Sequence, residues 1–182
     1  ATGENLVNFL RGDTQFQMGA AAPDNQVFRN RYSRLGDIVN AAPVYVAKPP
    51  FKYGDAGYSQ FITDHAKRTK MVYAAANDGM LHAFQVGENE NDPAGGDELW
   101  AFVPRGVLPH VRRLADVGYD AAHINLLDAT PTIGDVYSNG QWRTILVGGM
   151  GAGGRYYYAL DITDPASPAL LWEFSDTNLG LT

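Results

Sequence analysis

The residues most suggestive of chemistry form a glycine-rich segment, Gly149-Met-Gly-Ala-Gly-Gly154. Its letters fit the Gly-x-Gly-x-x-Gly fingerprint of dinucleotide-binding sites, in which the backbone approaches a pyrophosphate. That chemistry needs a helix directly afterwards, because the helix N-terminus holds the phosphates. The residues that follow, Arg155-Tyr-Tyr-Tyr-Ala-Leu-Asp-Ile162, have a strand pattern instead, and no Gly-Lys-Ser/Thr is present. The segment is therefore predicted to be a glycine-rich hairpin turn.

Acidic residues offer a second kind of chemistry, calcium binding. Asp161 and Asp164 are close together, and Asp128, Asp135 and Asp176 lie nearby in the sequence. A calcium loop places oxygen ligands at alternating positions within about 12 residues and ends on a bidentate acid. The chain has no Asp-x-Asp-x-Asp run, and aspartates at strand ends are usually turn formers. No metal ligand is predicted among these residues.

The histidines do not form a catalytic or metal-binding pattern. His65, His82, His110 and His123 are scattered, with no pair at metal-ligand spacing. His82 alternates with apolar neighbours, which favours a structural histidine with satisfied hydrogen bonds. The chain has no Cys and no Gly-x-Ser-x-Gly nucleophile elbow. No catalytic or cofactor-binding residue is predicted, and the chain is not expected to be an enzyme.

Two copies of one unit carry these residues. Each copy begins with a strand that contains Ala-Pro or Thr-Pro. A pair of strands joined by a turn comes next, and a further strand with a Leu-Trp-x-Phe core ends the unit. Such a four-stranded repeat, offset by about 72 to 74 residues, is typical of propeller blades. The recurring aromatic residues are predicted to pack in the blade cores. The matching segments are Ala42–Val46 with Thr130–Val136, Met71–Phe84 with Ile145–Asp161, and Glu98–Phe102 with Leu171–Phe174.

The predicted elements of the first unit begin at Leu35, with strand-like residues at Ile38-Val39 and Val44–Val46. Residues 48–69 form a long insertion, and loops of this length are usually functional or mobile. A buried strand runs from Lys70 to Ala76, Asn77-Asp78-Gly79 predicts a tight hairpin turn, and residues 87–97 form an acidic loop.

Short helices and a connector complete the prediction. Residues 2–11 are predicted to be a helix capped by Thr2 and ended by Gly12, too short to be stable unless it docks. Residues 13–35 read as a solvated connector whose Arg29, Arg31 and Arg34 face water. A second helix is predicted at 105–115, with Pro109 in its first turn, followed by strands near 124–127 and 131–136.

The fold class that follows is all-β: a partial modified β-propeller of about two four-stranded blades with short inserted helices. Residues 1–34 are assigned to an N-terminal helix and connector, and residues 35–182 to the first blades of a C-terminal β-propeller domain. Propellers need roughly four to eight blades, so two cannot close a ring. The chain is therefore expected to be a stretch of a larger propeller, with residues 176–182 leading toward a further strand.

Composition excludes several function classes. The chain has 182 residues, of which 45% are hydrophobic, so it is long and apolar enough to form a globular core. Its formal net charge of −6 argues against nucleic acid as the main partner, because phosphate binding needs a basic face. No apolar run approaches the ~20 residues of a membrane span.

Several motifs resemble the PilC/PilY family of type IV pilus tip-associated adhesins and assembly factors. The resemblance covers nearly the whole chain in order, and it is weakest at 14–34 and 48–69. The similar segments are Leu6–Asp13, Leu35–Val46, Tyr73–Phe84, Ala101–Pro104, Trp142–Arg155, Ala159–Pro165 and Leu171–Phe174.

The resemblance implies a modified β-propeller that is exported and displayed at the cell surface on the pilus tip. It implies support of pilus assembly, adhesion and twitching motility through contacts with minor pilins, the pilus tip complex and a host or surface receptor. It also implies calcium as a cofactor, bound by an Asp-x-Asp/Asn-x-Asp loop in a later blade. No residues of this chain match that loop, so no calcium ligand is assigned here.

Two alternatives stay open. A quinoprotein-like dehydrogenase that binds pyrroloquinoline quinone is one, because Ala159-Leu-Asp161 and Leu171-Trp172 are similar to the tryptophan-docking repeat of those enzymes. The other is a generic extracellular binding propeller, whose contact surface would be the 48–69 insertion and the acidic 87–97 loop.

Overall fold

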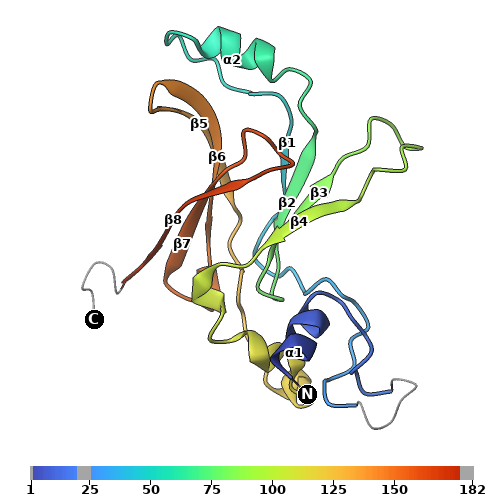
Figure 1. Ribbon diagram of the computed structural model, residues 1–182. Helices are drawn as coiled ribbons and strands as arrows, with labels where there is room; N and C mark the ends of the chain where they lie inside the picture. The colour runs from blue at the N-terminus through green and yellow to red at the C-terminus, as the bar shows by residue number, and fades with distance from the viewer. Residues whose placement is uncertain (1, 20–25, 177–182) are drawn as a thin grey trace.

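The computed structural model describes residues 2–19 and 26–176 and contains two four-stranded antiparallel sheets with short helices at their ends (Figure 1). In each sheet the strands are ordered as in the chain, so every neighbour is reached by a direct connection. The predicted all-β class with two four-stranded units is confirmed, and within the described ranges the two sheets do not close into a ring. The strands are β1 (Val44–Val46), β2 (Met71–Ala75), β3 (Leu81–Gln85), β4 (Glu98–Phe102), β5 (Thr132–Ser138), β6 (Gln141–Gly149), β7 (Tyr156–Asp161) and β8 (Ala169–Ser175).

The register of the two sheets repeats in detail. A β-bulge interrupts the pairing of β3 with β4 between Ala83 and Phe84, and another interrupts β7 with β8 between Ala159 and Leu160. Trp100 lies opposite Ala83, and Trp172 lies opposite Ala159. The duplicated sequence unit is therefore a duplicated structural unit, including its irregularity.

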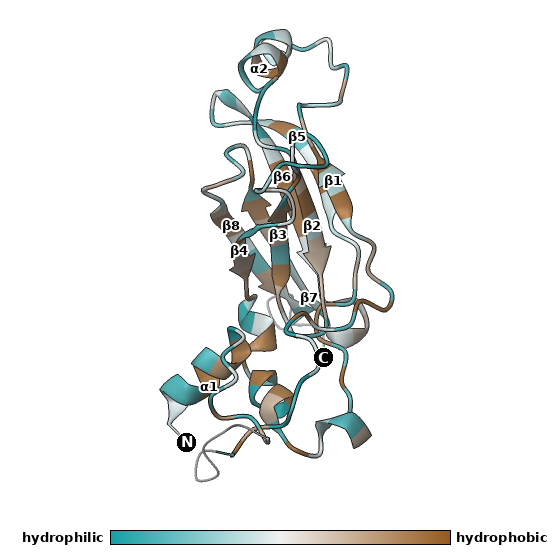
Figure 2. Ribbon diagram, turned by 90° about the vertical axis from the view of Figure 1, so that its right-hand side faces the viewer, coloured by the Kyte–Doolittle hydropathy of each residue, from teal (hydrophilic) through white to brown (hydrophobic). Residues whose placement is uncertain are grey.

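The main core lies between the two sheets and is built from apolar residues of both. Figure 2 shows hydrophobic segments, in brown, along the strands. Tyr73 and Leu81 of the first sheet and Leu146 and Tyr158 of the second are fully buried. The Phe102 ring lies 5.2 Å from the Tyr158 ring, centroid to centroid. Burying such large side chains is the main stabilisation available to two sheets that share one core.

The repeated tryptophans differ in burial. Trp100 is partly buried against the core, whereas Trp172 is 45% exposed and its neighbour Leu170 is 47% exposed. The prediction that both tryptophans pack in blade cores is wrong for Trp172. Both tryptophans lie on the last strand of their sheet, but the second unit covers Trp100, whose indole bonds the Pro165 carbonyl oxygen, whereas no further sheet lies beyond β8 in the described part of the chain.

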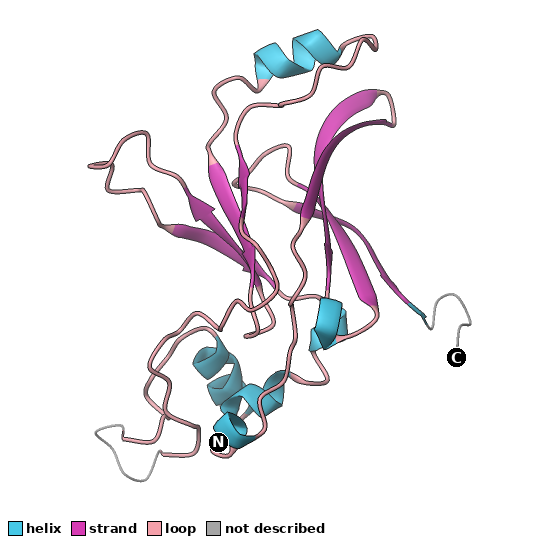
Figure 3. Ribbon diagram, turned by 180° about the vertical axis from the view of Figure 1, so that it is seen from behind, coloured by secondary structure: helices cyan, strands magenta, loops and turns pink. Residues whose placement is uncertain are grey.

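The predicted N-terminal helix is present as α1 (Gly3–Leu10). The Thr2 Oγ1 accepts a hydrogen bond from the Asn5 backbone N–H at 3.3 Å, and Gly12 follows the helix with φ +107°. The helix buries Phe9 and packs against the 3-10 helix η3 (Val111–Ala115), as expected for a helix too short to stand alone. Figure 3 shows these helices gathered at the end of the sheets opposite the helix α2 (Tyr58–Asp64).

The prediction of a solvated arginine cluster in the connector is wrong for two of its members. The Arg31 guanidinium lies 3.8 Å from the centroid of the Phe9 ring and donates to the Phe9 carbonyl oxygen at 2.6 Å. Arg29 covers the Tyr119 ring at 4.4 Å and donates to the Leu114 carbonyl oxygen. These arginines dock the connector, because a planar guanidinium can stack on a ring and bond a carbonyl together. Arg34 is exposed as predicted.

Three further predictions of local structure are wrong. Residues 105–115 form two 3-10 helices, η2 (Arg105–Val107) and η3, because the Pro109 ring would clash with the carbonyl four residues earlier in an α-helix. Ile38-Val39 and 124–127 are irregular rather than strands, although Leu126 and Leu127 are buried. The insertion contains a helix, α2 (Tyr58–Asp64). The predicted approach to a further strand falls at 177–182, outside the described residues.

Candidate binding site

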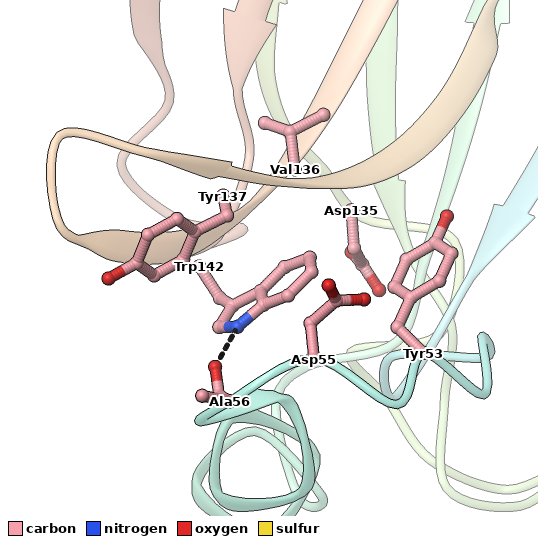
Figure 4. Close-up of a pocket in the computed structure, with 7 residues that line it drawn as sticks. All are labelled: Tyr53, Asp55, Ala56, Asp135, Val136, Tyr137 and Trp142. Atoms are coloured by element: carbon pink, nitrogen blue, oxygen red, sulfur yellow. Dashed lines mark hydrogen bonds between the residues drawn. The ribbon is translucent and has the colours of Figure 1, made fainter.

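A pocket lies where the 48–69 insertion meets the β5–β6 hairpin (Figure 4). The loop that precedes α2 covers this end of the hairpin, and the Trp142 indole Nε1 donates to the Ala56 carbonyl oxygen at 3.0 Å. The pocket has a volume of about 560 Å³ and is lined by Tyr53, Asp55, Ala56, Asp135, Val136, Tyr137 and Trp142.

Aromatic rings form the walls of this pocket. Tyr53 stacks on Trp142 with ring centroids 5.5 Å apart and planes 13° apart, and Tyr137 contacts the same indole at 5.6 Å. Tyr58 packs beneath Trp142 at 4.6 Å. Tyr53 is 41% exposed and Tyr137 is 60% exposed. Phe51 and Trp142 both stack on Tyr53, with ring centroids 5.2 Å and 5.5 Å away, so Tyr137 has the more accessible ring.

A buried carboxylate, Asp135, lies at the inner side of the pocket. It is 4% exposed and accepts hydrogen bonds from the Tyr58 hydroxyl and the Thr144 hydroxyl, each at 2.6 Å. Burial raises the pKa of Tyr58 well above its ordinary value, and the hydrogen bond to Asp135 raises it further. Tyr58 therefore stays protonated and acts as a donor at any physiological pH.

Arg68 supports this carboxylate from the side of the sheet. Its Nη1 donates to the Thr144 Oγ1 at 2.7 Å, and its Nε donates to the Ala47 carbonyl oxygen. Burial lowers the pKa of Arg68, and the charge of Asp135 offsets part of that effect. The polar network from Tyr58 through Asp135 and Thr144 to Arg68 thus fixes the insertion onto β5 and β6.

The second carboxylate of the pocket, Asp55, is exposed. Its side chain makes no hydrogen bond or ion pair with any of the described residues. Figure 4 shows this carboxylate pointing toward the space between Trp142 and Asp135. The pocket therefore combines partly exposed aromatic residues with a carboxylate that is free to contact a ligand.

A separate polar cluster surrounds His82 on the first sheet. Its Nε2 lies 3.0 Å from Asp78 Oδ2, and its Nδ1 lies 2.6 Å from Glu98 Oε1. Burial alone lowers the pKa of His82, but the hydrogen bonds and charges of Asp78 and Glu98 outweigh burial and raise it above its ordinary value. Asp78 also accepts the Gly36 backbone N–H at 2.8 Å. Both ring nitrogens are occupied, which confirms the predicted structural histidine.

The other histidines lie apart from one another. His65 Nδ1 bonds the Phe61 carbonyl oxygen at 2.9 Å, His123 lies 3.0 Å from Asp37 Oδ1, and His110 precedes η3. Between residues 2 and 19 and between 26 and 176, no group of three or more His, Asp or Glu side chains could hold a metal ion.

The aspartates considered for calcium serve other roles. Asp161 accepts the Thr163 backbone N–H at 3.0 Å and pairs with Arg143, and Asp164 accepts the Ala166 N–H at 3.1 Å, so both are turn formers as predicted. Asp128 accepts from the Asn40 backbone and side chain. The residues described here do not fit a calcium site, because their oxygens bond to N–H and O–H donors rather than converge on one point.

The glycine-rich segment is the predicted hairpin turn. Gly151 has φ +56°, the Met150 N–H bonds the Tyr156 carbonyl oxygen at 3.0 Å, and β7 follows directly. A Cβ on Gly153 would lie 2.0 Å from the Leu126 carbonyl oxygen. The glycines therefore allow close packing of two backbone segments, and the segment is a single 3-10 turn followed by a strand rather than the α-helix that would hold a phosphate.

The pocket itself was not predicted from the sequence. Ala56 and Trp142, which meet in its wall, are 86 residues apart, and spacing carries no signal for that contact. The available signal was the aromatic content of the insertion, which contributes Phe51, Tyr53, Tyr58 and Phe61.

Comparison with known proteins decides the family. A family model described as the PilY1 beta-propeller domain matches residues 35–179. The chain belongs to the PilY1 beta-propeller family. It is 39% identical over 181 residues to the type IV pilus biogenesis factor PilY1 of Pseudomonas aeruginosa PAO1, and the match covers 94% of this chain. It is also 39% identical over 193 residues to a PilY1 homolog of Xylella fastidiosa Temecula1, covering 97% of this chain.

A solved structure supports the same family. The chain is similar to the crystal structure of the Pseudomonas aeruginosa PilY1 C-terminal domain, with a TM-score of 0.55 and 33% identity, over 73% of this chain and 25% of that one. The predicted family and propeller fold are thereby confirmed. The chain spans only 14% of the length of the PAO1 PilY1 and 12% of the Xylella homolog. Among the described helices, none is long and apolar enough to cross a membrane.

Proposed function

We propose that this chain is a non-catalytic propeller segment of an exported type IV pilus biogenesis factor, and that it acts at the pilus tip on the cell surface. Its role is to support pilus assembly, adhesion and twitching motility through protein contacts, with minor pilins and the tip complex as partners. The observation that carries the proposal is the match of residues 35–179 to the PilY1 beta-propeller domain.

The relatives support the pilus part of this proposal. Those matched over nearly the whole chain are named type IV pilus biogenesis factors or their homologs, and none of these names denotes an enzyme. Because the chain spans a small part of each relative, the segment would contribute to the activity of a longer protein.

The geometry of the described residues favours contact rather than catalysis. The glycine-rich turn closes a hairpin, and His82 is held between Asp78 and Glu98 with both nitrogens bonded. No nucleophile and base lie together in the pocket of the insertion. Calcium binding stays a proposal for the longer protein, at residues outside this chain.

Two exposed regions are proposed as contact surfaces. The first is the 48–69 insertion, which is fixed to the second sheet by the Tyr58–Asp135 hydrogen bond and carries the exposed Lys52 and Lys67. The second is the acidic loop at 87–97, which projects from the β3–β4 hairpin of the first sheet (Figure 1). Loops on a rigid scaffold commonly carry recognition.

The test uses bacterial strains that express the protein at its natural length from the chromosome. One allele lacks residues 35–179, and a second carries Lys52→Glu with Lys67→Glu, which changes exposed charges without touching the core. We expect the deletion to remove surface pili and twitching, and the charge reversal to reduce adhesion or twitching at unchanged protein abundance. Normal piliation, adhesion and twitching in the deletion strain would overturn the proposal.

A further inference from the structure

The pocket between the insertion and the β5–β6 hairpin has features that are not needed to hold the two sheets together. Tyr53 and Tyr137 are partly exposed there, and Asp55 contributes an exposed carboxylate without a partner among the described residues. Aromatic side chains that serve only to pack would be buried, and a turn-forming aspartate would bond a nearby backbone N–H.

The aromatic walls suit a cation. The face of an aromatic ring carries negative charge density, so it attracts a cation that lies within about 6 Å of the ring centroid, and tryptophan is the strongest of the three rings. Tyr53 and Tyr137 contact Trp142 from two sides, with centroids 5.5 Å and 5.6 Å away. The three rings line the same pocket, so a cationic head bound there would lie near more than one of them.

The charges of the pocket point the same way. Both charged side chains that line it, Asp55 and Asp135, are carboxylates. Arg68 lies on the inner side of Asp135 and is held by Thr144 and Ala47, while Lys52 is exposed and is not part of the lining. Asp55 therefore supplies negative charge at the accessible side of the pocket, on a chain of formal net charge −6.

We propose that this pocket binds an organic ammonium group, with the rings of Tyr53, Tyr137 and Trp142 lining its walls and the Asp55 carboxylate as its counter-ion. Such a group is present at the end of a lysine side chain and in a quaternary ammonium headgroup. Asp135 does not move in this arrangement, because Tyr58 and Thr144 hold it. The inference does not depend on the proposed pilus function, since the pocket would bind a free cation in either case.

Isothermal titration calorimetry on the protein at its natural length tests the proposal with small probes. Choline and Nα-acetyl-lysine amide supply a quaternary and a primary ammonium, and 3,3-dimethylbutan-1-ol supplies the shape of choline without its charge. We expect saturable binding of at least one ammonium probe, weakened by added salt, and no heat from the neutral isostere. The preferred ammonium probe tells whether a quaternary headgroup or a lysine side chain is the source.

Three variants locate the binding. Asp55→Asn is expected to weaken ammonium binding roughly three- to tenfold, and Tyr137→Ala by a similar factor, because each removes one attraction at an exposed position. Asp97→Asn changes an exposed carboxylate on the other long loop and should leave binding unchanged. Equal melting temperatures of the variants show that the fold is intact.

Two results would overturn the proposal. One is the absence of binding by every ammonium probe at millimolar concentration. The other is binding that is equal for choline and its neutral isostere, or for the native protein and Asp55→Asn, which would assign the pocket to neutral ligands such as sugars stacked on the same rings.

Discussion

The Trp100 indole Nε1 donates a hydrogen bond to the Pro165 carbonyl oxygen across 2.8 Å. This bond joins β4, the last strand of the first sheet, to the turn between β7 and β8 of the second sheet. Trp172 has the same register position in its own sheet, but it is 45% exposed. Equivalent residues of the repeat thus differ in environment because only one of them has a neighbouring sheet in the described structure.

The two tryptophans are expected to respond differently to the same substitution. Trp100→Phe removes the bond to Pro165 and part of the contact between the sheets, and should lower the free energy of unfolding by about 1–2 kcal/mol. Trp172→Phe should change it by less than about 0.5 kcal/mol in the 182-residue chain, because the residue is half exposed. Urea denaturation measures both, and equal losses would contradict the assigned contact.

Two buried tyrosines give a second matched pair. Tyr58→Phe removes a donor from the buried Asp135 and should lower the free energy of unfolding by about 1–3 kcal/mol. The Tyr158 hydroxyl is buried without a hydrogen-bond partner among the described residues, so Tyr158→Phe should leave stability unchanged or raise it by up to about 1 kcal/mol. Thermal unfolding followed by circular dichroism checks the order of the two effects, and the reverse order would contradict the hydrogen-bond assignment.

His82 predicts a pH dependence of stability. Its pKa is raised in the folded chain by Asp78 and Glu98, so folding favours the protonated form. The stabilisation is fully present below the unfolded pKa of about 6.5 and is lost as pH rises through the higher folded pKa. The stability difference between the native chain and His82→Gln should therefore be larger at acidic than at alkaline pH. Denaturant titrations across that range test it, and a pH-independent difference would refute the charged pairing.

The glycine-rich turn predicts a steric difference between two glycines. Gly153→Ala places a Cβ 2.0 Å from the Leu126 carbonyl oxygen, a backbone atom, and should destabilise the chain by about 1–3 kcal/mol or more. Gly134→Ala on β5 meets no atom within 4 Å and should be nearly neutral. Melting temperatures of the two variants provide the measurement. Comparable melting temperatures would show that Gly153 is not needed for this packing.

The strands and turns could be predicted because their signals are local. The Asn77-Asp78-Gly79 turn places Gly79 at φ +85°, and the Asn139-Gly140 turn has positive φ at both residues, as the sequence pattern indicates. The repeat that contains Trp100 and Trp172 predicted two four-stranded units, as the structure shows. The error at 105–115 arose because Pro109 prevents an α-helix there. The error at Ile38-Val39 arose because the flanking backbone groups of Asp37 and Asn40 bond to Asn77 and Asp128 rather than to a neighbouring strand.

The candidate site could not be predicted, because its parts meet only through the fold. Tyr58 and Asp135 are 77 residues apart, and their bond depends on how the insertion covers the β5–β6 hairpin. The contacts of Arg29 and Arg31 with aromatic rings were missed for the same reason. A cluster of arginines in the sequence does not show which rings their side chains will cover. Contacts between distant segments decided both outcomes.

The central claim, that this segment acts through contacts at the pilus, is tested most directly by cross-linking on intact piliated cells. An amine-reactive cross-linker followed by mass spectrometry would report neighbours of Lys52 and Lys67, the exposed lysines of the insertion. The account predicts cross-links from this segment to pilin subunits or to other proteins of the pilus tip. Cells with abundant pili and abundant full-length protein, but with cross-links only within the protein itself, would contradict it.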